Sequence, residues 1–317
     1  MEKTIHVQVP ATSANCGPGF DCLGLAVDLC NDFQYTISDR WSSFHLEVEG
    51  EGKEWLKPSG RNLAFASFLR VWNEVTNRRH IGIRIHMINR IPQSRGLGSS
   101  STAIVAGVLA ASVLTDRHFS KEELLAYANE LEGHPDNVAP AIYGGFTVSI
   151  QEQGRPYTLR LEPKLPLQFI AVVPDQPLST SLARKAIPAS VPHQDAVFNE
   201  SRSALLVAAL AADRPEFLRF ALEDRLHQPY RAHLIPGMEE VFAAGRDAGA
   251  WQCILSGAGS TLMAYAPVSA DGDAIGDAMV RAFAARGQRA CYHKLHLNRE
   301  GAVVVEELLT DHWSRRK

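Results

Sequence analysis

Residues 91–102 read Ile-Pro-Gln-Ser-Arg-Gly-Leu-Gly-Ser-Ser-Ser-Thr, and an apolar run from Ala103 to Leu114 follows them. We expect a strand to lead into this stretch, and the apolar run predicts a buried helix behind it. Glycine lets a backbone approach a ligand closely. The first turn of a helix presents unpaired N–H groups and a positive dipole end, which suit a phosphate. The stretch therefore indicates a phosphate-binding loop, although a serine-capped turn ahead of a buried helix has the same local pattern.

Two common phosphate loops do not fit this stretch. A Walker A loop requires Lys after its last glycine, and this chain has Ser99 there. A dinucleotide-binding loop requires a third glycine, and this chain has Ser101 there. A third kind of loop remains, in which the hydroxyl groups of Ser99 and Ser100 offer hydrogen-bond donors or a magnesium ligand.

Composition limits the classes of function. A chain of 317 residues with 45% hydrophobic and 21% charged residues is typical of a globular protein, and its length favours two domains. The formal net charge is −3 and the basic residues are not clustered, so nucleic acid is not expected as a partner.

Targeting signals and cysteine pairs are also not apparent. The first residues lack the basic and apolar regions of a signal peptide. The run from Ala103 to Leu114 is far shorter than the roughly 20 residues that a membrane span needs. The five cysteines are odd in number and lack CxxC spacing, so we expect no disulfide, no zinc site and a cytoplasmic location.

The pattern of apolar residues favours an α+β fold. Alternation predicts strands through Ile5–Val9, Phe44–Val48 and Ile81–Met87. Ser120 with Glu123 indicates a capping box at a helix start, Asp213 with Pro215 and Glu216 indicates a second helix through Phe217 and Ala221, and a third is expected from Val197 to Ala212. Because strands and helices follow no regular βαβ rhythm, a doubly wound sheet is disfavoured.

A domain boundary is expected between Gln151 and Pro166, where Gly154, Pro156 and Pro163 interrupt a charged stretch. We place the two domains at residues 1–155 and 156–317. The apolar segment from Phe169 to Val173 predicts the first strand of the second domain.

Three motifs in order resemble those of the GHMP kinases, which phosphorylate small alcohols. Residues 92–102 resemble the family's Pro-x-x-x-Gly-Leu-Gly-Ser-Ser phosphate loop. Residues 10–24 resemble its first motif, and residues 255–261, Leu-Ser-Gly-Ala-Gly-Ser-Thr, resemble its third. The resemblance covers most of the chain, and it implies a ribosomal-protein-S5-like N-terminal domain and a ferredoxin-like C-terminal domain, with ATP and substrate between them. Cys16 and Ser101 depart from residues that are common in these motifs.

The segment His134-Pro135-Asp136-Asn137 resembles the members of the family that phosphorylate homoserine. This resemblance implies that Asp21 binds the amino group of the substrate and that arginines bind its carboxylate through paired hydrogen bonds. The implied substrate-binding residues are Asn15, Asp21, His134, Asn137, Thr180, Arg184 and Arg231, and we assign Asn137 and Arg184 to catalysis. Arg225 remains an alternative to Arg231.

ATP and Mg²⁺ are the implied cofactors. The residues expected to bind ATP are Asn62, Pro92, Gln93, Ser94, Arg95, Gly96, Leu97, Gly98, Ser99, Ser100, Ser101 and Thr102. Mg²⁺ prefers oxygen ligands, and the resemblance implies Ser100 and Glu130, with Glu132 as an alternative to Glu130. Phosphoryl transfer needs little prior deprotonation of the acceptor, so we expect no strong general base.

The sequence leaves open the oligomeric state and two alternative functions. Family members are often homodimers, so a homodimer is possible. Phosphorylation of a different small alcohol is one alternative function. A sensor of nucleotides or amino acids that performs no chemistry is another.

Overall fold

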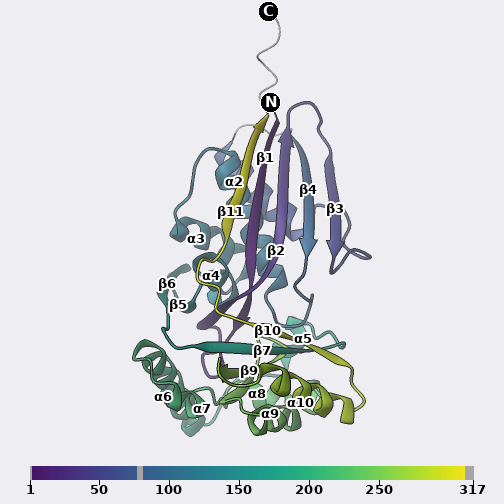
Figure 1. Ribbon diagram of the computed structural model, residues 1–317. Coiled ribbons are helices and arrows are strands. Elements are labelled where there is room, and N and C mark those ends of the chain that lie inside the picture. The colour runs from purple at the N-terminus through teal and green to yellow at the C-terminus, as the bar shows by residue number, and fades with distance from the viewer. Residues whose placement is uncertain (1, 77–80, 311–317) are drawn as a thin grey trace, which may run out of the picture.

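The structure, a computed structural model, describes residues 2–76 and 81–310. It is built around two β-sheets (Figure 1). The strands of the first sheet run along the long axis of the molecule, and those of the second sheet cross below the end of the first. Within the described residues, no helix combines the length and apolar character needed to cross a membrane.

The first sheet has the strand order β11-β1-β2-β4-β3, and β5 extends it by pairing with β2 and β6. Its strands are β1 (Glu2–Ala14), β2 (Leu23–Ser38), β3 (Phe44–Gly50), β4 (Gly82–Asn89), β5 (Phe146–Glu152), β6 (Arg155–Leu161) and β11 (Val303–Thr310). The predicted strands near residues 5, 44 and 81 are therefore confirmed. Only β3 and β4 among the described pairs are parallel.

One face of this sheet packs on helices, and the alternation in β1 shows why. Ile5, Val7 and Val9 have no exposed surface, whereas His6 and Gln8 between them are half-buried. The apolar face contacts α1 (Leu63–Val75), α2 (Ser99–Leu114), α3 (Lys121–Glu132) and α4 (Pro135–Tyr143). Burial of apolar side chains between these layers is the main stabilising contribution.

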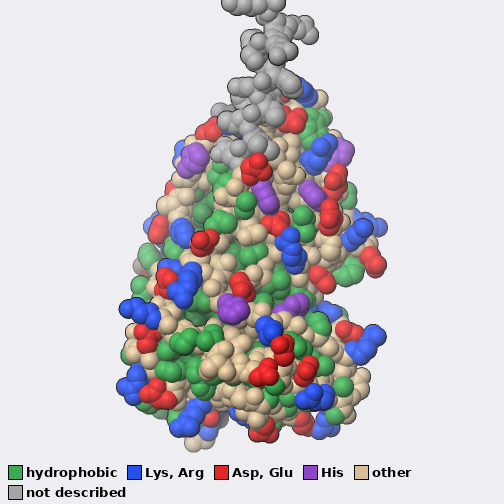
Figure 2. Space-filling view, viewed as in Figure 1, with side chains coloured by type: hydrophobic (Ala, Val, Ile, Leu, Met, Phe, Trp, Pro, Cys, Tyr) green, Lys and Arg blue, Asp and Glu red, His purple; other side chains and the backbone are tan. Residues whose placement is uncertain are grey.

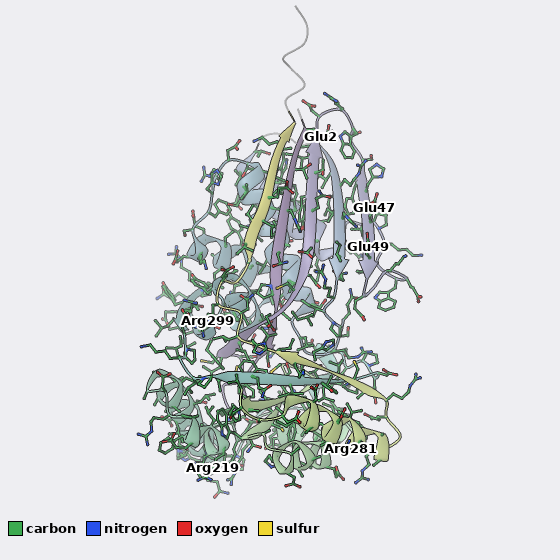
Figure 3. All side chains as sticks on the ribbon, viewed as in Figure 1. Glu2, Glu47, Glu49, Arg219, Arg281 and Arg299 are labelled. Atoms are coloured by element: carbon green, nitrogen blue, oxygen red, sulfur yellow. The ribbon has the colours of Figure 1, made fainter. Side chains whose placement is uncertain are left out.

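The opposite face of the first sheet is polar. Thr4 and Thr36 share a hydrogen bond on it, and the Asp32 carboxylate accepts one from Gln8. Acidic, basic and histidine side chains are interspersed on the side of the molecule in Figure 2, with no gathering of one sign. Figure 3 places Glu47 and Glu49 along β3 at the edge of the sheet, where charge disfavours pairing with another chain.

The second sheet has the antiparallel order β10-β7-β9-β8. Its strands are β7 (Leu167–Pro174), β8 (Gln252–Leu255), β9 (Leu262–Pro267) and β10 (Ala290–Leu295), and α9 (Met238–Asp247) and α10 (Gly272–Ala285) pack on it. This β-α-β-β-α-β arrangement is the ferredoxin-like fold that was expected. The prediction that a strand over Phe169–Val173 opens the second part is confirmed by β7.

The remaining helices correct one prediction and refine another. They are α5 (Thr180–Lys185), α6 (His193–Ala211), α7 (Leu218–Ala221) and α8 (Gln228–Arg231), with 3₁₀ turns at Pro215–Phe217 and Ala232–Leu234. The helix expected from Val197 begins earlier, at His193. Asp213 does not cap the next helix: its φ is 54° and its carboxylate accepts from the Lys164 N–H instead. Only a 3₁₀ turn and one short helix form there.

The strand pairing bears on the predicted division between residues 155 and 156. Strand β6 begins at Arg155 and pairs with β5 of the first sheet. Strand β11, near the end of the chain, pairs with β1 in the same sheet. We propose that the first domain extends to Leu161 and also includes β11.

Candidate active site

The predicted phosphate loop connects β4 to α2, and its geometry distinguishes the two interpretations of the sequence. The residue that precedes the helix is Gly98, with φ of 68°, and it provides no side-chain cap. A Cβ at this position would lie 1.9 Å from Thr12 Oγ1, so the loop needs glycine for a close approach to β1. The arrangement is not a serine cap, and no side chain of the capping residue blocks the first N–H groups of α2.

Two cavities meet at this loop. Both are lined by Ser94, Ser99 and Ser100. The first encloses about 100 Å³ and the second about 170 Å³. Since Ser99 and Ser100 lie at the start of α2, a phosphate held by the helix N-terminus would lie between the two cavities.

The second cavity contains the predicted adenine-contacting residue. Asn62 lines it and caps α1 by accepting a hydrogen bond from the Phe65 N–H at 3.2 Å. The other residues of this cavity are mostly apolar or small: Leu56, Leu63, Ala64, Met87 and Ala103, with Arg61, Asn89 and Gln93.

Not every residue of the predicted phosphate loop faces a cavity. The first cavity is lined by Ser94, Gly96, Leu97, Gly98, Ser99, Ser100 and Ser101. Arg95 points elsewhere and donates to the carbonyls of Pro174 and Gln93. The Thr102 hydroxyl donates to the Ser99 carbonyl and is fully buried. Neither cavity is lined by Arg95, Thr102 or Pro92. Arg95 and Thr102 instead stabilise the loop through these hydrogen bonds.

All seven predicted substrate-binding residues line the first cavity. They come from the loop after β1, from α4, from α5 and from α8, and they are Asn15, Asp21, His134, Asn137, Thr180, Arg184 and Arg231. Segments that lie more than 200 residues apart in the chain thus meet in one space, at the junction of the two sheets.

Asp21 and Arg184 form an ion pair across this cavity. Arg184 Nη1 and Nη2 donate to the two carboxylate oxygens at 3.0 and 2.8 Å. The hydrogen bond to Asp21 raises the pKa of the Arg184 guanidinium. Asp21 has φ of 56°, and its N–H donates to Asn15 Oδ1 at 3.1 Å. Asn15 therefore orients the loop that presents Asp21.

Arg231 is the second guanidinium of the cavity, and it is 2% exposed. It donates to the carbonyls of Ala183 and Gly257, each at 3.1 Å. Burial, and secondarily the nearby Arg184, lower its pKa to about 10. Arg225 instead pairs with Asp195 and stacks on Phe198, outside this cavity. The geometry favours Arg231 over Arg225 as the carboxylate ligand.

His134 and Asp136 add a further charged group beside Asp21. His134 Nδ1 lies 2.5 Å from Asp136 Oδ1, and this hydrogen bond raises the pKa of His134. Asp21, His134 and Asp136 each offer one ligand atom within 4.8 Å of the others. Such a group can hold a cation, either a metal ion or the ammonium of an amino acid. Asp136 is not among the site residues predicted from the sequence, and its place between His134 and Asn137 in the same motif is the signal that could have found it.

The positions of the two candidate metal ligands favour Glu132 over Glu130, which was the first choice from the sequence. Its carboxylate accepts two hydrogen bonds of 3.0 Å from Arg70, and Glu130 does not line either cavity. Glu132 lines the first cavity and accepts from the Ser101 hydroxyl at 2.7 Å. Residues two apart on a helix point in nearly opposite directions, so only one of these carboxylates can face the loop.

A Mg²⁺ ion is compatible with the residues that do face the loop. Burial raises the pKa of Glu132, which indicates a carboxylate short of compensating positive charge. Ser100 supplies a hydroxyl oxygen where both cavities meet. Oxygen ligands of this kind suit a hard cation.

Comparisons with known proteins identify the family of the chain. The model for the GHMP kinases N terminal domain matches residues 62–145, and that for the GHMP kinases C terminal domain matches residues 205–285. The homoserine kinase of Desulfitobacterium hafniense is 40% identical over 301 residues, covering 95% of this chain and 100% of the relative. That of Streptomyces coelicolor is 43% identical over 304 residues, with coverages of 95% and 94%.

Solved structures give the same result. The crystal structure of homoserine kinase from Cytophaga hutchinsonii superposes with a TM-score of 0.87 at 30% identity, covering 95% of this chain and 97% of that one. The mevalonate kinase of L. major in complex with R-mevalonate has a TM-score of 0.66 at 16% identity, covering 94% of this chain and 96% of that one, and shows a shared fold. Since the similarity to homoserine kinases extends over nearly the whole chain, the chain belongs to the GHMP kinases and, within them, to the homoserine kinases.

Proposed function

We propose that the protein transfers the γ-phosphoryl group of ATP to the side-chain hydroxyl of L-homoserine, which yields O-phospho-L-homoserine and ADP. The observation that carries this proposal is the junction of two cavities at Ser94, Ser99 and Ser100. One cavity suits a nucleotide base next to a helix N-terminus. The other presents acidic side chains and two arginines, as a zwitterionic amino acid requires.

The ion pair between Asp21 and Arg184 supports a zwitterionic substrate. In the free protein these two side chains neutralise each other. The ammonium group of homoserine can take the place of Arg184 beside Asp21, and its carboxylate can bind Arg184 and Arg231. A ligand with a carboxylate alone would separate the pair and leave Asp21 without a partner, which is unfavourable in a partly buried site. The pair therefore selects against alcohols such as mevalonate.

The second cavity would hold the adenosine of ATP near Asn62, and the N–H groups at the start of α2 would bind its phosphates. Glu132 and Ser100 would hold Mg²⁺, which supplies charge neutralisation for the phosphates when bound. Asn137 is oriented by the Thr12 hydroxyl, which donates to its Oδ1 at 2.8 Å. We assign Asn137 and Arg184 to orienting and stabilising the transferred group.

In the reaction a new P–O bond forms to the homoserine oxygen while the bond from the γ-phosphorus to ADP breaks, and the hydroxyl proton leaves to solvent. No strong base is required, because the transition state of phosphoryl transfer is loose. Asp136 is already engaged by His134. A single-turnover rate lower by orders of magnitude in Asp136→Asn, with binding intact, would contradict this part of the proposal.

The direct test is ADP production by the purified protein with ATP, Mg²⁺ and a panel of homoserine, mevalonate, galactose, shikimate and pantoate. We expect turnover with homoserine and background rates with the others. Turnover of a different alcohol would overturn the substrate assignment. Tight ATP binding without any turnover would favour a sensor. A homodimer and a cytoplasmic location remain predictions, and sedimentation of the purified protein would test the first.

A further inference from the structure

A buried polar group lies directly behind the basic side of the first cavity. It consists of Asp224, His227 and Arg231, and the His227 and Asp224 side chains have no exposed surface. Polar groups so deeply buried are unfavourable unless each is hydrogen-bonded. The mechanism proposed above uses only Arg231 of the three, so the role of the other two needs an explanation.

The partners of His227 define its protonation. Its Nε2 lies 2.8 Å from the Gly17 carbonyl, which can only accept, so Nε2 carries a proton. Its Nδ1 lies 3.2 Å from Arg231 Nη1, which can only donate, so Nδ1 is the acceptor. Burial lowers the pKa of His227, which favours the same neutral ring. A protonated ring would present an N–H group to the guanidinium and break this contact.

Asp224 holds the backbone that carries His227. Its carboxylate accepts from the N–H groups of Leu226, His227 and Gln228 at 3.0, 3.0 and 2.7 Å. Asn199 Nδ2 donates to it at 2.7 Å. Three successive N–H groups on one carboxylate fix the turn that begins α8, and thereby the position of the imidazole.

His227 thus contacts both sides of the substrate cavity. Through Nδ1 it holds Arg231, on the side assigned to the carboxylate of the substrate. Through Nε2 it holds Gly17, in the loop that presents Asp21 on the side assigned to the ammonium. The Phe20 ring of this loop lies 5.4 Å from the His227 ring and 5.4 Å from the Arg231 guanidinium.

We propose that neutral His227 is a positioning residue that sets the distance between the carboxylate-binding and ammonium-binding sides of the site. It acts through Arg231 and through Gly17 and does not touch the substrate. This inference rests on the proposed function, because the two sides are defined by homoserine. By setting this distance, His227 would help the site to select substrates that carry both an ammonium and a carboxylate group. This role goes beyond filling space in the core.

Two substitutions separate the two contacts of His227. In His227→Gln the side-chain amide N–H can still reach the Gly17 carbonyl, but no acceptor remains at the former Nδ1 position beside Arg231. In His227→Asn the side-chain carbonyl lies near the former Nδ1 and can still accept from Arg231, but the donor to Gly17 is lost. Both variants lose about one hydrogen bond and some packing, so they form a matched pair for stability.

The experiment measures kcat and KM for both substrates, together with inhibition by two fragments of homoserine. 4-Hydroxybutanoate carries the carboxylate alone, and 3-aminopropan-1-ol carries the ammonium alone. We expect His227→Gln to raise the KM for homoserine and the inhibition constant of 4-hydroxybutanoate about tenfold, since a hydrogen bond to a charged group is lost. The inhibition constant of 3-aminopropan-1-ol and the KM for ATP should stay near those of the wild type. His227→Asn should instead raise the inhibition constant of 3-aminopropan-1-ol and leave that of 4-hydroxybutanoate near the wild-type value.

Equal effects of both variants on both fragments, or no effect on homoserine, would show that His227 only fills space. If the wild-type protein did not phosphorylate homoserine, the proposed function would fail instead, and the two failures are therefore distinguishable. Should either variant not fold, the ¹⁵N chemical shifts of the wild-type ring provide the test. We expect an unprotonated Nδ1 and a protonated Nε2 near neutral pH, and the opposite tautomer or a charged ring would overturn the proposal.

Discussion

Arg184 and Arg225 show how position, rather than residue type, gives an arginine its role. Arg184 faces the substrate cavity, whereas Arg225 pairs with Asp195 outside it. We expect Arg184→Ala to raise the KM for homoserine by about ten- to a hundredfold, because charge-assisted hydrogen bonds are lost. Arg225→Ala should leave this KM nearly unchanged. Steady-state kinetics at saturating ATP measure both, and equal effects of the two substitutions would contradict the assignment.

The two carboxylates at the end of α3 provide a second comparison at the residue scale. Glu132→Gln should raise the Mg²⁺ concentration needed for half-maximal rate and lower kcat, since a half-buried oxygen ligand is weakened. Glu130→Gln only loses its surface pair with Arg70. Such a pair contributes about 0 to 1 kcal/mol to stability and nothing to metal binding. A Mg²⁺ titration of the two variants that gave the reverse order would restore Glu130 as the ligand.

At the scale of elements, the start of α2 depends on Gly98. An alanine there would suffer the unfavourable left-handed conformation and also collide with Thr12. Gly154, in the β5–β6 turn, has φ of 78° but nothing near its would-be Cβ, so Gly154→Ala is a control for the conformation alone. We expect only Gly98→Ala to raise the KM for ATP, by about tenfold or more, because the loop must move away from the phosphates. Similar KM values in both variants would exclude a phosphate role for this turn.

The polar face of the first sheet predicts a dependence of stability on pH. Asp32 of β2 accepts from Gln8 and His6 of β1 and pairs with Arg90 after β4. Burial raises the pKa of Asp32, but the hydrogen bonds from Arg90, Gln8 and His6 outweigh it, so the net pKa is lowered. A lowered pKa in the folded state stabilises the protein above the unfolded value of about 3.9, and this contribution is lost as the pH falls through the folded value.

Asp32→Asn should therefore reduce the free energy of unfolding near pH 7 by about 1 to 2 kcal/mol. The difference from the wild type should shrink as the pH falls below about 4, because the wild-type carboxyl then becomes protonated as well. Urea unfolding at the two pH values measures this. Asp116→Asn, which removes an exposed carboxylate paired with Lys3, is the control and should show a smaller difference at pH 7. A difference that persisted unchanged in acid would contradict the assigned cause.

At the scale of the whole molecule, the two sheets are not made from consecutive halves of the chain. A break between Gly154 and Arg155 would leave β6 and β11 of the first sheet in the second fragment. We expect the two co-expressed fragments to remain associated and to retain kinase activity, because these strands complete the first sheet and the active site combines both fragments. Size-exclusion chromatography with an ADP assay checks this. Fragments that elute separately as folded species would favour the division at residue 155.

Local sequence determined the elements and the general nature of the site. The alternation in β1, the capping box at Ser120 and the phosphate loop ahead of α2 depend on neighbouring residues, so their patterns are visible in the sequence. The seven residues predicted to bind the substrate were chosen because they belong to motifs of a family, not because their spacing in the chain brings them together, and their role stays a prediction.

Only the tertiary structure determined which way individual side chains point and which distant segments of the chain are in contact. Glu130 and Glu132 differ by about 200° around a helix, and only the packing of α3 determines which one faces the loop. Contacts between segments far apart in the sequence place Arg231, and not Arg225, at the first cavity. Such contacts also place β11 beside β1. The pairing of His227 with Gly17 across more than 200 residues has no local signal, because the imidazole gains its partners only when the chain is folded.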